Sequence, residues 1–130
     1  MDMDTAELRD VPLFAGLSDE DLARVATWLE IVDVPPDWHL LNIGSQSEGF
    51  FVVLQGRVSV RRDGVEVATL GPGQFFGEMG LLQDEQRNAT VVTATETRAA
   101  VMDAAGFASM CEELPVIGER IQEAAAKRGG

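Results

Sequence analysis

The sequence reads Phe76-Gly77-Glu78-Met79-Gly80-Leu81-Leu82 and, after four further residues, Arg87-Asn88-Ala89-Thr90-Val91. Gly77 can adopt a positive φ or let a ligand approach the backbone closely, and a turn of helix after it would aim free amide N–H groups at an anion. Arg87 supplies a planar cation that can hold phosphate oxygens through two hydrogen bonds. Glu78 can accept a hydrogen bond from a ribose hydroxyl. This stretch therefore predicts a pocket for a sugar phosphate, placed directly before a β-branched strand.

The spacing of these residues also carries a resemblance. Residues 76–90 fit the pattern Phe-Gly-Glu-x-x-Leu-x-x-x-x-x-Arg-x-Ala-Thr without a gap, and this pattern resembles the phosphate-binding cassette of cyclic-nucleotide-binding domains. The similarity extends over about residues 10–128 and is greatest to bacterial cyclic-nucleotide-regulated potassium channels. Outside the cassette it is carried by Val11-Pro12-Leu13-Phe14 with Leu17, by the run from Phe50 to Val60, and by the run from Leu70 to Phe76.

Two positions of the cassette depart from the family pattern. Gln86 stands where a proline often precedes the arginine, and Asn88 stands where alanine, serine or threonine is common. The catabolite activator protein also lacks that proline, so its absence is compatible with binding. Asn88 leaves the preference for one purine base over the other open.

The resemblance implies that the domain binds a 3′,5′-cyclic nucleotide, with cAMP expected ahead of cGMP. It implies ligand contacts from the cassette, from one strand and from the last helix: Gly77, Glu78, Met79, Gly80, Arg87, Asn88, Ala89, Val60 and Arg128. Plainer alternatives stay open for several of them. Glu78 and Arg87, taken singly, also fit a structural ion pair. Asn88 fits a residue that satisfies backbone groups at the start of a strand, Val60 fits a core position, and Arg128 fits a solvated residue near a helix C-terminus.

Composition limits the class of protein and its partners. The 130 residues suit one domain, 1–130, and their formal charge is −12, from 10 basic and 22 acidic side chains. Nucleic acid is therefore not an expected direct partner. Cys111 is the single cysteine, so no internal disulfide can form, and the acidic N-terminus does not resemble a signal peptide. The longest apolar run, Phe50 to Leu54, is too short for a membrane span, so we expect a cytoplasmic domain without direct membrane contact.

Hydrophobic patterning and turn signals predict a mainly β fold with flanking α-helices. We expect a β jelly roll, or double-stranded β-helix, over about residues 30–102 with the cassette at 76–90. Its strands are predicted at Ile31–Val34, Leu40–Ile43, Phe50–Leu54, Ala89–Ala94 and Arg98–Met102, and in a hairpin around Asp63-Gly64. A two-residue type I′ turn there pairs Arg62 with Val65, Arg61 with Glu66, Val60 with Val67, Ser59 with Ala68, and Val58 with Thr69. In that register Val58, Val60, Val65 and Val67 share one apolar face, and Val60 and Val67 are core residues.

Helices are predicted on both sides of the jelly roll. One N-terminal helix covers about residues 18–29, with Ser18 as its N-cap and acidic residues in its first turn. Two C-terminal helices cover about residues 103–128, the first capped by Asp103 and the second beginning at Pro115. On the last helix one face carries Ile117, Ile121, Ala124 and Arg128. We expect this apolar stripe to close as a lid over the base of the nucleotide.

These observations favour a ligand-binding sensor over an enzyme. The sequence has no P-loop, no nucleophile motif and no cysteine cluster, and a single histidine, His39, cannot supply a cupin-like metal site. We therefore expect no catalytic residue, no metal and no cofactor, and a cyclic nucleotide as the ligand that moves the C-terminal helices. The alternative is a degenerate domain that keeps the fold for protein–protein contact and binds no nucleotide. The effector protein, a channel or another regulated partner, is not named by the sequence.

Overall fold

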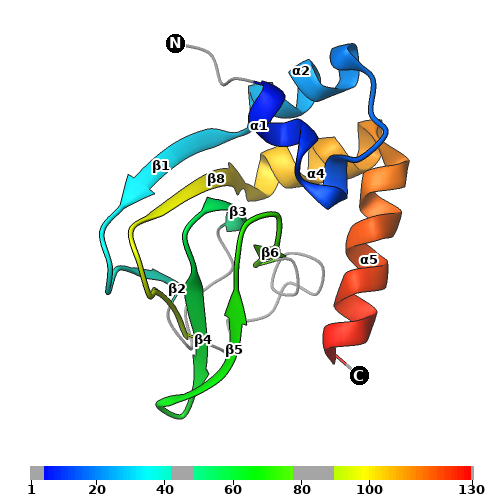
Figure 1. Ribbon diagram of the computed structural model, residues 1–130. Helices are drawn as coiled ribbons and strands as arrows, with labels where there is room; N and C mark the ends of the chain where they lie inside the picture. Colours follow the sequence, from blue (N-terminus) through cyan, green and yellow to red (C-terminus); the bar gives the residue numbers. More distant parts are fainter. Residues whose placement is uncertain (1–4, 42–48, 78–89, 130) are drawn as a thin grey trace.

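The computed structural model describes residues 5–41, 49–77 and 90–129, without side-chain detail at residues 5, 41, 128 and 129. In these ranges a group of helices lies at one end and along one side of two β-sheets (Figure 1). The helices are α1 (Thr5–Arg9), the 3₁₀ helix η1 (Pro12–Phe14), α2 (Asp19–Trp28), α4 (Ala104–Glu113) and α5 (Pro115–Gly129). The strands are β1 (Glu30–Val34), β2 (His39–Leu41), β3 (Gly49–Gln55), β4 (Val58–Arg62), β5 (Val65–Leu70), β6 (Phe75–Phe76), β7 (Thr90–Thr93) and β8 (Thr97–Asp103).

The two sheets are antiparallel, with strand orders β1-β8-β3-β6 and β2-β7-β4-β5. This architecture confirms the prediction of a mainly β jelly roll with flanking helices. The strands predicted to begin at Ile31, Phe50, Ala89 and Arg98 all lie within one residue of the predicted bounds. β2 confirms the start of the strand predicted at Leu40, and residues 42 and 43 lie outside the described ranges.

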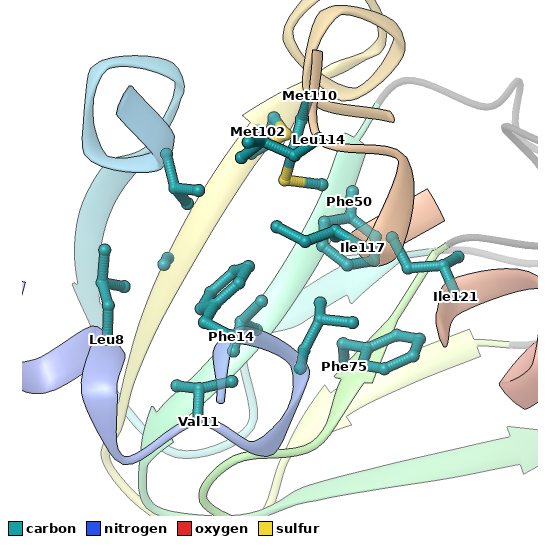
Figure 2. Packing of buried hydrophobic residues seen from close by; sticks show 14 of the residues in the cluster. Leu8, Val11, Phe14, Phe50, Phe75, Met102, Met110, Leu114, Ile117 and Ile121 are labelled. Atoms are coloured by element: carbon teal, nitrogen blue, oxygen red, sulfur yellow. The ribbon is translucent and has the colours of Figure 1, made fainter. Parts of the chain in front are cut away.

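The central strand β3 separates two hydrophobic cores. Its side chains alternate, so that Phe50 and Val52 pack toward the helices while Phe51 and Val53 pack toward the other sheet. Figure 2 shows the helix-side core, in which Phe50 lies among residues of the N-terminal and C-terminal segments. The ring of Phe50 lies 5.4 Å from that of Phe75 and 5.1 Å from that of Phe107. One sheet is thus covered on both faces, which explains the unbroken apolar run that the sequence shows there.

The prediction for the β4–β5 hairpin is correct at its turn. Asp63 and Gly64 have φ of 54° and 78°, and a type I′ turn requires positive φ at both central residues. The two pairs nearest the turn also form as predicted. The remaining pairs are wrong by one residue: the structure pairs Val60 with Ala68, Ser59 with Thr69, and Val58 with Leu70.

A β-bulge explains the error in the register. Val67 is an extra residue on β5, between the part of the strand that pairs as predicted and the part that is shifted. Val67 is 54% exposed and Val65 is 63% exposed, so the prediction of Val67 as a core residue is wrong. Leu70 takes its place in the core between the sheets, together with Val58.

The helix termini follow the predicted capping. Ser18 Oγ accepts a hydrogen bond from the backbone N–H of Asp21 at 3.1 Å, and Asp103 Oδ1 accepts one from Gly106 at 2.7 Å. The five-residue helix α1 was not predicted, because one turn of helix is too short to show hydrophobic periodicity. Its Leu8 is nevertheless completely buried in the helix-side core.

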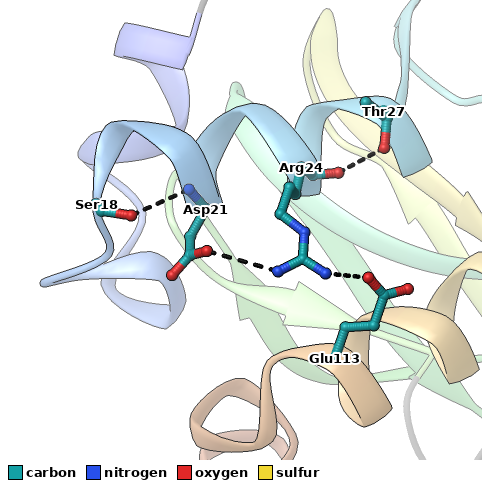
Figure 3. Close-up of polar contacts among 5 residues, drawn as sticks. All are labelled: Ser18, Asp21, Arg24, Thr27 and Glu113. Carbon is teal, nitrogen blue, oxygen red and sulfur yellow. Dashed lines mark hydrogen bonds and ion pairs between the residues drawn. The ribbon is translucent and has the colours of Figure 1, made fainter.

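Arg24 and Arg120 link the helices to one another. Arg24 of α2 forms ion pairs with Asp21 on its own helix, at 3.7 Å, and with Glu113 at the end of α4 (Figure 3). Arg120 of α5 donates hydrogen bonds to two carbonyl oxygens at the end of η1, those of Leu13 at 2.8 Å and Ala15 at 2.9 Å. These contacts hold α5 and the N-terminal segment together. Within the described part of the chain, no helix has the length and hydropathy needed to cross a membrane.

Candidate functional site

The predicted cassette connects the two sheets. It begins in β6, where Phe76 pairs with Phe51 of β3 in the first sheet. It ends in β7, where Thr90 pairs with Arg61 of β4 in the second sheet. The intervening residues, which include Glu78, Met79, Gly80, Arg87, Asn88 and Ala89, lie outside the described residues. The structure therefore fixes the two ends of the cassette and not the positions of these six predicted ligand contacts.

The start of the cassette is held by aromatic packing. The ring of Phe76 stacks on that of Phe51, with ring centroids 4.8 Å apart and an interplanar angle of 3°. Both side chains belong to the core between the sheets. Gly77 follows with φ of 97°, a conformation that side-chain-bearing residues rarely adopt. A positive φ was one of the two roles that the sequence allowed for Gly77, and the structure shows it at the point where the cassette begins.

Val60 lies on the face of its sheet that points into the jelly roll. It is half-buried and packs at the margin of the core formed by Val58 and Val91. Across the bulge it faces Ala68, which is exposed. Val60 and Ala68 thus form a small apolar surface that is only partly covered. Ala68 was not predicted to share this face, because the bulge that places it there leaves no signal in the hydrophobic alternation.

The lid prediction for α5 needs correction. Ile117 and Ile121 are completely buried in the helix-side core, together with Phe14 and Met110 (Figure 2). The apolar stripe is therefore already covered over the first half of the helix and is not available to a ligand there. Arg128 lies in α5 two helical turns beyond Ile121, but its side chain is outside the described residues.

Contacts within the fold shift the pKa of Arg98 and of Cys111. The pKa of Arg98 is raised, first because Glu7 accepts its hydrogen bonds and also through Asp33, while desolvation acts in the opposite direction. Burial raises the pKa of the Cys111 thiol and so disfavours the thiolate, its reactive form. The partners of Arg98, which lies on β8, are on α1 and β1, and Cys111 lies on α4.

Comparison with known proteins identifies the family. The family described as "Cyclic nucleotide-binding domain" matches residues 31–114, which include the whole cassette. The chain is 36% identical over 120 residues to the cyclic nucleotide-gated potassium channel mll3241 of Mesorhizobium japonicum, a match that covers 92% of this chain and 33% of the channel. It is 34% identical over 101 residues to the cAMP-dependent protein kinase regulatory subunit of Eremothecium gossypii, covering 77% of this chain and 22% of the subunit.

A solved structure agrees with these matches. The Thermus thermophilus catabolite activator protein superimposes with a TM-score of 0.82 at 26% sequence identity, covering 90% of this chain and 57% of that one. The present chain spans about a third of the length of the Mesorhizobium channel. Fold, cassette pattern and family match agree, and the chain belongs to the cyclic nucleotide-binding domain family.

Proposed function

We propose that the domain is a sensor that binds cAMP in preference to cGMP and passes the binding event to its C-terminal helix. The observation that carries the proposal is the presence of both Glu78 and Arg87 at the family spacing, in a cassette whose ends are fixed to the two sheets. A domain that kept the fold only for protein contact would have no physical need for this acid and this cation. The Eremothecium relative, described as a regulatory subunit of a cAMP-dependent kinase, supports cAMP as the first ligand to test.

Each proposed contact has a distinct chemical task. Arg87 holds the phosphate through two hydrogen bonds, and Glu78 accepts a hydrogen bond from the ribose 2′-hydroxyl. The purine projects from this sugar phosphate and needs apolar surface to cover it. The partly open surface of Val60 and Ala68 supports a site for the base at this place. The net charge of −12 gives a phosphate no long-range attraction, so the affinity depends on Arg87 and on local backbone donors.

We further infer that the response to ligand is confined to the second half of α5. Ile117 and Ile121 anchor the first half in the core, and Arg120 ties it to η1. The segment from Gln122 to Arg128 lies beyond these anchors, and its described contacts with the core come from the small side chains of Ala124 and Ala125, so it can change its position at less cost than the first half of the helix. The ligand can shift the equilibrium between the two positions of this segment only by the difference in its affinity for them.

Calorimetric titration tests the binding function. We expect cAMP to bind more tightly than cGMP, and 5′-AMP, which lacks the cyclic phosphodiester, to bind far more weakly. Arg87→Ala is expected to weaken cAMP binding by about 2–5 kcal/mol, because a desolvated phosphate loses its charged partner. Arg57→Ala is the matched control, since Arg57 is exposed in the turn before β4. Equal affinities of folded Arg87→Ala and wild type would contradict the proposal, and no binding of any nucleotide would favour the degenerate alternative.

Hydrogen exchange tests the coupling separately. Addition of cAMP is expected to raise protection in residues 78–89 and in the segment 122–128, and to leave residues 115–121 unchanged because Ile117 and Ile121 already anchor that half of the helix in the core. Protection that changes in the cassette alone would show that the signal does not pass through α5.

A further inference from the structure

Arg61 and Arg62 are neighbours on β4, but their side chains lie on opposite faces of the sheet. Successive side chains of a strand alternate between its two faces, and β4 pairs with β7 without a break in register. Val58 and Val60 pack on the core between the sheets, so Arg62, two residues after Val60, shares their face. Arg61 lies on the other face, where its Nε donates a hydrogen bond to Oγ of the buried Ser59 at 3.2 Å. Only Arg62 is therefore directed toward the inner side of the jelly roll.

The guanidinium of Arg62 has no acidic partner in the described part of the chain. The hairpin, residues 58–70, has no net charge, because Asp63 and Glu66 balance its two arginines. Glu66 pairs with Arg61, so its side chain lies on the outer face. Among the described residues, no hydrogen bond or ion pair joins the side chain of Arg62 to Asp63, to Glu66 or to any other group. What distinguishes Arg62 is thus its position on the inner face and its free hydrogen-bond donors.

Arg62 lies beside the surface that we propose for the base. Val60 faces Ala68 across the hairpin, and Arg62 faces Val65 one step nearer the turn. Because paired residues of neighbouring strands point to the same face, all four side chains share the inner face. Two residues along a strand span about 7 Å, a distance that the long side chain of Arg62 can bridge. Val65 and Ala68 are exposed, so the apolar surface beside the cation is open.

The end of the cassette reaches the same part of β4. Thr90, the first described residue after the cassette, pairs with Arg61. Arg62 therefore lies next to the point where the cassette enters the second sheet. A ligand held by the cassette is brought to the end of β4 that carries this arginine.

We propose that Arg62 is a further ligand-contact residue, whose guanidinium stacks on the ring of a purine that lies on Val60 and Ala68. The inference rests on the proposed function and adds a contact to the same site. A guanidinium is planar and weakly hydrated, and it stacks favourably on aromatic rings. The first half of α5 cannot cover the ring instead, because Ile117 and Ile121 are buried in the helix-side core. Stacking uses the face of the ring and not its edge, so Arg62 strengthens the binding of adenine and guanine alike.

Calorimetric titration of the 130-residue chain with cAMP and cGMP tests the role of Arg62. Arg62→Ala is expected to weaken the binding of both nucleotides by similar factors, about 5- to 30-fold, the range of a cation–π contact in a partly desolvated site. Arg61→Ala is the matched control and is expected to change neither affinity by more than about two-fold, since its side chain lies on the outer face. Circular dichroism checks that each variant is folded. A loss confined to cGMP would indicate a hydrogen bond to the guanine edge and would overturn the stacking.

Two further variants separate stacking from attraction between charges. Arg62→Tyr keeps a planar group without charge, and Arg62→Lys keeps the charge without the planar group. We expect the tyrosine variant to bind cAMP more tightly than the lysine variant does. Equal or tighter binding by the lysine variant would assign the contact to the phosphate charge and overturn the inference.

The same titrations distinguish this inference from the proposed function. Wild-type binding that Arg87→Ala weakens and Arg62→Ala leaves within about two-fold would overturn the role of Arg62 alone. A wild-type chain that binds no cyclic nucleotide would overturn both.

Discussion

Replacing Gly56 with alanine is expected to destabilise the domain severely, because this glycine lies where two turns of the jelly roll touch. Gly56 has φ of 90°, and a Cβ there would lie 2.3 Å from the carbonyl oxygen of Glu96. It would also lie 2.9 Å from Oγ1 of both Thr95 and Thr97. These threonines hold the two turns together: Thr95 Oγ1 accepts a hydrogen bond from Arg57 N–H at 3.0 Å, and Thr97 Oγ1 donates to the carbonyl of Arg57 at 3.3 Å.

The magnitude can be worked out from these contacts. A side chain in the left-handed conformation costs about 1–2 kcal/mol, and forcing a carbon against a backbone oxygen costs about 1–3 kcal/mol. A displaced hydrogen bond between the turns costs about 1 kcal/mol more. The reduced freedom of the unfolded chain offsets about 0.4–1 kcal/mol. We therefore expect Gly56→Ala to lower the free energy of unfolding by about 2–6 kcal/mol, a large part of the stability of an ordinary domain.

Gly16→Ala is the matched control. Gly16 has a similar φ of 82°, but no atom lies within 4 Å of the added Cβ, so only the backbone strain remains. The expected loss is about 1 kcal/mol. Urea unfolding followed by circular dichroism measures both variants, with a common m-value as the check that the unfolded state is unchanged. A difference of less than about 1 kcal/mol between the two variants would refute the reasoning, since it would mean that the steric contact at Gly56 has no consequence.

Three further results are expected. In calorimetry, the 2′-deoxy analogue of cAMP should bind the wild type about 1–3 kcal/mol more weakly than cAMP does, and Glu78→Ala should lose this discrimination. Equal discrimination in both proteins would assign the ribose contact to another group. In urea titrations, Ile121→Ala should lower the free energy of unfolding by about 2–5 kcal/mol, whereas Val116→Ala, at an exposed position of the same helix, should change it by no more than about 0.5 kcal/mol. Similar effects of the two substitutions would contradict the anchoring of α5. Alkylation of Cys111 should reach its half-maximal rate at a higher pH in the folded protein than in the urea-unfolded chain, because burial raises the pKa of the thiol. A midpoint at or below that of the unfolded chain would contradict that burial.

The raised pKa of Cys111 also makes the free energy of unfolding depend on pH. The folded state holds the thiol neutral to a higher pH than the unfolded state does, so the contribution of this thiol to stability is fully present below the pKa of the unfolded chain. It is lost as the pH rises through the raised pKa of the folded state.

Local signals in the sequence were sufficient for the ends of elements and for the fold class. Ser18 and Asp103 cap their helices as predicted, because a capping side chain bonds to a backbone group only three residues away. The Asp63-Gly64 turn formed as predicted for the same reason, since its two residues decide its conformation. The positive φ of Gly77 is another property of a single residue and its neighbours.

The wrong predictions concern contacts between distant residues. The register predicted for β4 and β5 is correct as far as Glu66. A single bulge at Val67 shifts all later pairs by one residue and exposes Val67, which was assigned to the core. The periodicity of α5 correctly identified Ile117 and Ile121 as one apolar face, yet it could not say which surface that face covers. The helix-side core took the face that was expected to close over a ligand.

The sequence by itself determined the family, the cassette pattern and the residues with the chemistry to hold a sugar phosphate, because these depend on residue type and spacing along the chain. Only the tertiary structure decided that Phe76 is fixed on Phe51, that Val60 faces Ala68, and that α5 is anchored through its first half. The physical reason is that hydrophobic burial has no preferred direction. An apolar face is stabilised by any surface that excludes water, and the choice among such surfaces is made when the whole chain packs.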